Sequence, residues 1–168
     1  PIGGIVPLME QQRYRELFEI LLASKSNLPP DRPVHFFGCG HPMLFPMAIA
    51  LGVDMFDSAA YAIFARDDRL LTPEGTVKLG GIQEWPFHSH ALFGTTPQNV
   101  REMEKDERSI ILAKHNLEVT QAELSRCREA IRNGTIWELA EKRSHASPHL
   151  REAFVWVQGQ LDDPDEGP

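Results

Sequence analysis

An acidic residue at the end of a short apolar run is the feature of this chain that most suggests chemistry. Asp57 follows the run 53–56, which comes directly after a helix-like segment that ends near Gly52. Catalytic groups of parallel α/β barrels lie at the C-terminal ends of strands, so Asp57 is a candidate nucleophile or acid–base group. Position alone favours a simpler interpretation, in which Asp57 is a turn former or a helix cap.

Glycines follow two other predicted strands. Gly3 and Gly4 lie in the apolar segment 1–7, and Gly38-Cys39-Gly40-His41 follows the buried strand 34–38. Each glycine pair alone fits a tight turn at least as well as a ligand site. Together with Asp57 they place pocket-forming residues at three consecutive strand ends, which predicts one shared pocket.

Histidines offer a second kind of chemistry. His88 and His90 lie one residue apart in an irregular segment, and His115 lies on a long predicted helix. Three such side chains would suffice for a metal site, although an isolated histidine is more often a satisfied surface or core residue. Of the two cysteines, Cys127 is interpreted as a buried helix residue. Cys39 has no identifiable partner base, so we expect no thiol nucleophile.

The elements that must position these residues alternate between strand and helix. Apolar patterning predicts a strand within 2–6, a helix over 10–24, a strand over 34–38, a helix over 42–51 and a strand over 53–56. That order implies a parallel sheet with right-handed crossovers. Three strands are too few to complete a barrel, so we expect this chain to be part of a larger domain.

The second half is predicted to be mostly helical. A helical turn over 58–64 and a hairpin over 65–76 precede an irregular segment, 80–97. A long helix over 106–132 carries one apolar stripe, Gly134 ends it, and Thr135 with Glu138 forms a capping box for the next helix. Ser147 and Pro148 open the last helix. The stripe consists of Ile110, Ala113, Leu117, Leu124 and Ile131.

Composition excludes several classes of protein. The 168 residues are 42% hydrophobic, with no apolar run long enough to span a bilayer, and no signal peptide is visible in them. Two cysteines give no disulfide framework, so we expect a reducing cytoplasm. The net charge of −7 argues weakly against a nucleic-acid partner, but four of the acids lie in the tail 161–168, which we expect to be disordered.

Several motifs in order along the chain resemble the archaeal tRNA-guanine transglycosylase family. The resemblance implies an α/β fold, the C-terminal half of a TIM (β/α)8 barrel with a zinc-subdomain-like insertion and C-terminal helices. It assigns 1–79 to barrel strands 6–8, 80–118 to the insertion and 119–160 to the helices. The motifs are Pro1–Glu10, Pro33–Gly38, Val53–Ala59, Leu71–Thr76, Thr96–Gln98, His115–Leu117 and Trp137–Leu139.

The same resemblance implies a reaction. Archaeal members exchange guanine 15 in the tRNA D-arm for the base preQ0, on the route to archaeosine. The family nucleophile corresponds to Asp57, and its base-binding turn corresponds to Gly3 and Gly4, with Ile5 and Val6 adjacent. Arg66 and Arg69 are weaker predictions, as contacts to tRNA phosphates.

Two departures from the family pattern matter. The second catalytic aspartate lies in the N-terminal half of the family domain, so activity is expected only with that half present. The family's zinc cysteines correspond here to Phe87, Ser89 and Leu92, and only the ligand at His115 remains. Either zinc is lost and apolar packing replaces it, which we favour, or His88, His90 and His115 build a substitute site.

Two other functions remain open at this point. The chain could be a non-catalytic tRNA-binding or assembly subunit derived from the same fold, or a helix-rich protein–protein module. The family also predicts a homodimer formed around the zinc insertion. No membrane partner is expected.

Overall fold

Three chain segments run parallel near the N-terminus. The computed structural model describes residues 1–162 and pairs β1 (His35–Phe37) with β2 (Met55–Asp57), with Phe37 opposite Asp57. Ile2 forms a parallel bridge on the other side of β1, so the order is Ile2, β1, β2. The predicted parallel arrangement is confirmed, with shorter strands than expected.

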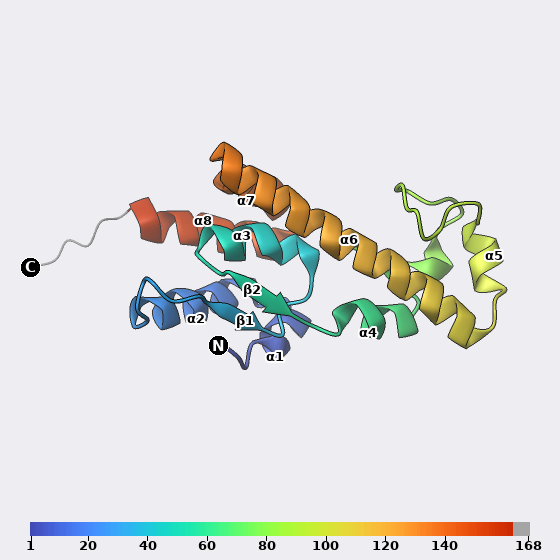
Figure 1. Ribbon diagram of the computed structural model, residues 1–168, viewed down its shortest axis with the longest axis horizontal. Helices are drawn as coiled ribbons and strands as arrows, with labels where there is room; N and C mark the ends of the chain where they lie inside the picture. The colour runs from blue at the N-terminus through green and yellow to red at the C-terminus, as the bar shows by residue number, and fades with distance from the viewer. Residues whose placement is uncertain (163–168) are drawn as a thin grey trace, which may run out of the picture.

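Helices predominate in this mixed α/β structure (Figure 1). An antiparallel hairpin, β3–β4, follows the parallel strands. The remaining elements in chain order are α1 (Val6–Glu10), α2 (Tyr14–Ser26), the 3₁₀ turn η1 (Pro42–Leu44), α3 (Phe45–Ala50), α4 (Ala60–Arg66), β3 (Arg69–Thr72), β4 (Gly75–Lys78), the 3₁₀ turn η2 (Leu79–Gly81), α5 (Pro97–Arg101), α6 (Lys105–Asn133), α7 (Ile136–Ser144) and α8 (Pro148–Asp162).

The first helix begins earlier than the sequence predicted. A strand was expected through Val6 and a helix from Glu10, but α1 starts at Val6 and a second helix starts at Tyr14. Pro7 lies in the first turn of α1, where its fixed φ favours a helix and its missing N–H costs nothing. Only Ile2 keeps a strand-like pairing.

Two hydrophobic clusters lie along the molecule. The larger one joins α2, α3 and α8 to β1, with Phe18, Phe36, Phe45 and Phe154 fully buried. The smaller one lies under the hairpin and the irregular segment and includes Leu92. The long helix α6 passes from one to the other (Figure 1).

The predicted apolar stripe of α6 coincides only in part with its buried face, since Ala113 and Leu124 pack against the hydrophobic clusters. Ile110, Leu117 and Ile131 are 58%, 42% and 54% exposed. The buried residues of α6 are Leu112, Cys127 and Ala130 together with polar side chains, including Asn116 and Glu123, whose hydrogen bonds are satisfied inside the protein. A hydrophobic pattern does not register buried polar residues, so it indicated only part of the buried face.

The helix ends agree only partly with expectation. Gly134 adopts the left-handed conformation, φ 71°, and ends α6 as predicted. Thr135 makes no side-chain cap, so the predicted capping box is wrong; its hydroxyl points instead to the carbonyl of Ala130.

Leu161 and Asp162, expected in a disordered tail, are the last residues of α8, and residues 163–168 lie outside the described part. None of the helices described is both long enough and apolar enough to cross a membrane.

Candidate active site

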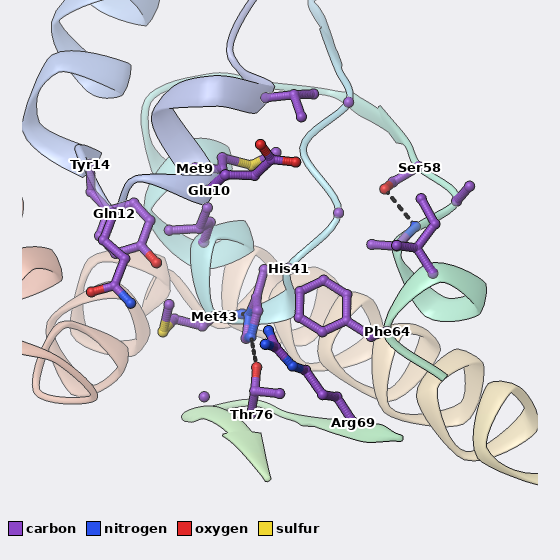
Figure 2. Close-up of a pocket in the computed structure, with 18 of the residues that line it drawn as sticks. Met9, Glu10, Gln12, Tyr14, His41, Met43, Ser58, Phe64, Arg69 and Thr76 are labelled. Carbon is purple, nitrogen blue, oxygen red and sulfur yellow. Dashed lines mark hydrogen bonds between the residues drawn. The ribbon is translucent and has the colours of Figure 1, made fainter. Parts of the chain in front are cut away.

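A pocket of about 760 Å³ opens at the C-terminal ends of β1 and β2. Asp57, Gly38 and Gly40 line it from the strand ends, and Thr76 and Arg69 line it from the hairpin. Figure 2 shows His41, Phe64, Arg69 and Thr76 on one wall, with Met9, Glu10, Gln12 and Tyr14 on another. The predicted convergence of strand ends on one pocket therefore holds for β1 and β2.

Asp57 presents a partly fixed carboxylate to this pocket. Its side chain is 50% exposed. The Oδ1 atom accepts a hydrogen bond from the Gly38 N–H at 3.2 Å and lies 3.0 Å from Nε2 of His35. Within residues 1–162, no protein hydrogen bond reaches Oδ2. One oxygen is therefore held while the other has no hydrogen-bond partner among these residues, in a half-exposed side chain. This suits a nucleophile better than a buried structural acid.

Glycine at position 40 permits the close approach of two strand ends. A Cβ atom there would lie 2.0 Å from Oγ of Ser58 and 2.7 Å from Cβ of Ala60. Ser58 in turn accepts a hydrogen bond from the Ala60 N–H at 2.9 Å, drawn as a dashed line in Figure 2. Gly40 thus lets the loop after β1 pack against the start of α4, directly beside Asp57.

His41 links that loop to the hairpin. Its Nδ1 accepts from the Met43 N–H at 3.1 Å, so Nε2 carries the proton of the neutral ring and donates to Thr76 Oγ1 at 3.1 Å (Figure 2). Burial lowers the pKa of His41 to about 4, although the neighbouring Gly75 carbonyl favours the charged form. His41 is therefore neutral at physiological pH.

The lowered pKa of His41 predicts a loss of stability in mild acid. In the unfolded chain His41 has the ordinary pKa of 6.5. As the pH falls, His41 is therefore protonated in the unfolded chain before it is protonated in the folded one. The free energy of unfolding should therefore fall from about pH 6.5 towards pH 4 and stay flat above that window. His41→Asn keeps the Nδ1-like acceptor but cannot titrate, so its urea midpoint should fall less.

Urea unfolding at pH 7, 6 and 5 measures this difference. Burial also lowers the pKa of His115. Part of the dependence of the unfolding free energy on pH should therefore remain in both the original chain and His41→Asn. Exposed His149 offers a matched control, since His149→Asn should retain the full slope. Equal slopes for the original chain and His41→Asn would contradict the assignment.

Buried polar side chains fix the hairpin beside the pocket. Asn116 is fully buried, accepts from the Leu71 N–H at 2.8 Å and donates to the carbonyls of Tyr61 and Arg69. It thereby ties α4 and β3 to α6. The pocket residues of the hairpin are held by this amide rather than by apolar packing alone.

A buried ion pair also contacts the hairpin. Arg143 of α7 donates from Nε and Nη2 to both carboxylate oxygens of fully buried Glu123, at 2.6 and 3.1 Å. Its remaining nitrogen lies 3.6 Å from Glu74 in the β3–β4 turn. The pair therefore connects α6, α7 and the turn that lines the pocket.

The other predicted substrate contacts are placed differently. Val6 lines the pocket, whereas Gly3 and Gly4 are exposed outside its lining and Ile5 is fully buried in the larger cluster. Their backbone groups stay a prediction for base binding.

The two predicted tRNA-binding arginines also differ in position. Arg69 lines the pocket, pairs with Asp67 at 2.8 Å and lies over the ring of Phe64. Arg66 is exposed in the last turn of α4. Their contacts with phosphate stay a prediction, with Arg69 the nearer of the two to the pocket.

The four positions that correspond to the family zinc ligands lie together, and two of them, Phe87 and Leu92, carry no donor atom. Phe87 stacks on the buried ring of His115 with centroids 4.5 Å apart, and Leu92 is buried in the smaller cluster. Nε2 of His115 lies 3.1 Å from the Leu71 carbonyl, and Nδ1 lies 2.9 Å from Oγ of Ser89. Both ring nitrogens are therefore engaged within the protein.

Glu118 fastens the loop that contains these residues. Its carboxylate accepts from the N–H groups of His90 and Ala91 at 2.9 and 3.3 Å, and lies 3.1 Å from the Ser89 hydroxyl. Burial alone would raise its pKa, but these hydrogen bonds and the nearby His90 ring outweigh it and lower the pKa of Glu118. The loop is thus anchored to α6 by an ionised side chain.

The three histidines named as a substitute site differ in their surroundings. His88 and His90 are exposed, whereas His115 is buried beneath Phe87. Across residues 1–162 no group of three or more His, Cys, Asp or Glu side chains is arranged to hold a metal ion.

The cysteines are both buried and free. Cys127 is a core residue of α6, as predicted. Cys39 lies in the larger cluster rather than in the pocket lining, and burial raises its pKa to about 12. Thiol chemistry is therefore not available at the pocket.

Sequence patterns did not identify several residues around the site. His35, His41 and Thr76 interact only after strands and hairpin are brought together. Asn116 and Glu118 lie on a helix whose buried face was predicted only in part. One signal was available for His35: it lies two residues before Phe37 on a strand, so both side chains face the same side.

Comparison with known proteins gives a consistent result. The profile of the family described as "Queuine tRNA-ribosyltransferase" matches residues 1–149. The chain is 50% identical over 154 residues to a tRNA-guanine(15) transglycosylase of Thermococcus kodakarensis, covering 92% of this chain and 27% of that protein. Proteins of the same description from Pyrococcus abyssi and Methanocaldococcus jannaschii are 51% and 49% identical, over 92% and 96% of this chain. The chain spans about a quarter of the length of these curated relatives.

Proposed function

The chain belongs to the queuine tRNA-ribosyltransferase family, and we propose that it supplies part of the catalytic domain of a tRNA-guanine transglycosylase. The enzyme would exchange guanine 15 of tRNA for preQ0, in archaeosine synthesis. The observation that carries the proposal is Asp57, with one carboxylate oxygen held and the other free in a pocket at the strand ends.

The proposed reaction is a double displacement at the ribose. A carboxylate oxygen of Asp57 attacks C1′ of nucleotide 15, the glycosidic bond to guanine breaks, and its electron pair leaves with the base, which is protonated. A covalent glycosyl–enzyme ester results. The nitrogen of preQ0 then attacks C1′, loses its proton and releases Asp57. The group that handles the proton transfers is expected outside this chain.

The proposed architecture follows the family. Residues 1–79 would contribute the sixth to eighth strands of a TIM barrel, 80–118 a subdomain corresponding to the zinc insertion, and 119–160 the C-terminal helices. The remaining part of the catalytic domain is the first partner, tRNA and the free base are the others, and the cytoplasm is the proposed compartment. A homodimer is proposed by family analogy.

Reconstitution tests the function. This chain is co-expressed with the N-terminal half of its catalytic domain, and the complex is incubated with tRNA and labelled guanine. We expect label to enter tRNA at position 15 and a denaturation-resistant adduct with tRNA to accumulate in the presence of a base analogue. Salt-dependent tRNA binding without either signal would instead identify a non-catalytic binding or assembly subunit.

We also propose that the chain does not use the family zinc. The donors needed for a tetrahedral site are nitrogen, sulfur or carboxylate atoms, whereas Phe87 and Leu92 offer none and His115 has both nitrogens occupied. The residues present therefore do not fit the metal. Glu118 holds the loop to α6 instead, through its hydrogen bonds from the N–H groups of His90 and Ala91.

This proposal predicts that metal removal has no effect on stability. Dialysis of the purified chain against EDTA should leave its thermal midpoint unchanged, and elemental analysis should find no stoichiometric zinc. Glu118→Ala should lower the free energy of unfolding by about 1–3 kcal/mol, because two backbone donors lose a charged acceptor. Exposed Glu141→Ala is the matched control and should change little.

Two results would overturn the metal-free loop. One is a zinc ion per chain together with a midpoint that falls on chelation. The other is a Glu118→Ala variant as stable as the Glu141→Ala control.

A further inference from the structure

We infer that His35 is a positioning residue for the nucleophile, and that it selects Oδ2 of Asp57 as the attacking atom. The inference rests on the proposed function of Asp57 and extends it to a second residue. It depends on the strand register, on two hydrogen bonds to one oxygen, and on the packing of the His35 ring.

The register brings the two side chains together. β1 and β2 are parallel, with His35 opposite Met55 and Phe37 opposite Asp57. Alternate residues of a strand face the same side, so His35 and Asp57 lie diagonally across one face. The structure places Nε2 of His35 3.0 Å from Oδ1 of Asp57.

The direction of this hydrogen bond follows from the partners. An ionised carboxylate only accepts, so Nε2 of His35 must carry the proton. The Gly38 N–H donates to the same Oδ1 atom at 3.2 Å. Two donors on Oδ1 fix the rotation of the carboxylate and leave Oδ2 as the oxygen with free lone pairs.

The His35 ring is itself held in place. The Phe37 ring lies edge-on to it, with centroids 5.6 Å apart and an interplanar angle of 67°. The side chain of His35 is 29% exposed and that of Asp57 50%. A pair this accessible adds little to folding stability, so its value lies in the orientation of the nucleophile.

Two substitutions separate orientation from structure. His35→Leu removes the donor at similar bulk, whereas His35→Gln can place an amide N–H near the position of Nε2. In the reconstituted enzyme we expect His35→Leu to lower kcat about 100-fold, because a misaligned nucleophile loses that order of rate. KM for tRNA and the urea midpoint should stay unchanged, and His35→Gln should recover at least a tenth of the original kcat.

His149→Leu is the control, since His149 is exposed on α8 and lines no part of the pocket. An unchanged kcat in His35→Leu would overturn the inference. So would a His35→Gln variant as slow as His35→Leu, or a defect confined to KM.

A spectroscopic measurement keeps this test separate from the proposed function. Ring ¹⁵N shifts of His35 in the isolated chain report which nitrogen carries the proton. We expect the Nε2–H form to dominate, and to give way to a tautomer mixture in Asp57→Ala. An unchanged ring pattern in Asp57→Ala would overturn the contact even if exchange activity were normal. Absence of exchange by the unsubstituted complex, with the ring pattern as expected, would remove the proposed function and the catalytic role of the pair, but not the contact between His35 and Asp57.

Discussion

Replacing Asp57 by alanine is expected to abolish base exchange by the reconstituted enzyme. The substitution removes the only group proposed to bond C1′, so kcat should fall by about 10⁴-fold or more, as when an essential nucleophile is removed from other enzymes. The covalent adduct with tRNA should also disappear from denaturing gels. Because the Asp57 carboxylate is half-exposed and at the end of its strand, the urea midpoint of the chain should barely change.

Asp31→Ala is a matched control, since Asp31 is exposed in the loop between α2 and β1. It should exchange guanine at the original rate. Normal exchange by Asp57→Ala would exclude Asp57 as the nucleophile, and with it the proposed double displacement.

The second large effect is expected at the buried ion pair. Arg143→Leu leaves the Glu123 carboxylate fully buried without its bidentate partner. The exposed Arg126, 3.4 Å from Glu123, replaces it only in part. The free energy of unfolding should fall by about 3–5 kcal/mol, as when one partner of a buried pair is removed. Urea titration of the chain measures the loss.

Two further variants distinguish an orphaned charge from lost packing. The double substitution Glu123→Leu with Arg143→Leu should recover much of the loss, since apolar replacement of a buried pair is often neutral. Arg132→Leu removes an exposed pair with Glu129 on the same helix and should cost about 1 kcal/mol or less. Equal losses for Arg143→Leu and Arg132→Leu would contradict the assigned role.

Elements with strong local signals were predicted well from the sequence. The strand at 34–38, the helical region over 42–51 and the ending of α6 at Gly134 follow from apolar runs and glycine positions. The hairpin was also predicted, but it lies over 69–78 rather than 65–76. The faces of α6 followed only in part, because its buried side also carries Asn116 and Glu123. Such polar residues are stable in the interior only through partners far along the chain, which no local pattern reveals.

The residues of the candidate active site could likewise be predicted only where a local sequence signal exists. Asp57 and the glycines of the β1 loop could be predicted to share a pocket, since parallel strand ends meet at one edge of a sheet. The contacts of His35 with Asp57 and of His41 with Thr76 depend on register and on the seating of the hairpin. Both contacts are results of tertiary packing, so the sequence indicated at most which face of its strand His35 occupies and not which residue it contacts.

The loop fastened by Glu118 has a consequence for oxidative damage. Thiolates bound to zinc are oxidised readily, and their oxidation releases the metal and the loop it holds. Here the corresponding side chains are Phe87, Ser89 and Leu92, which have no thiol to lose. The two cysteines of the chain are buried, and burial raises the pKa of each to about 12, so neither is a thiolate at neutral pH. This part of the protein should therefore keep its conformation under peroxide at concentrations that would open a cysteine-ligated site.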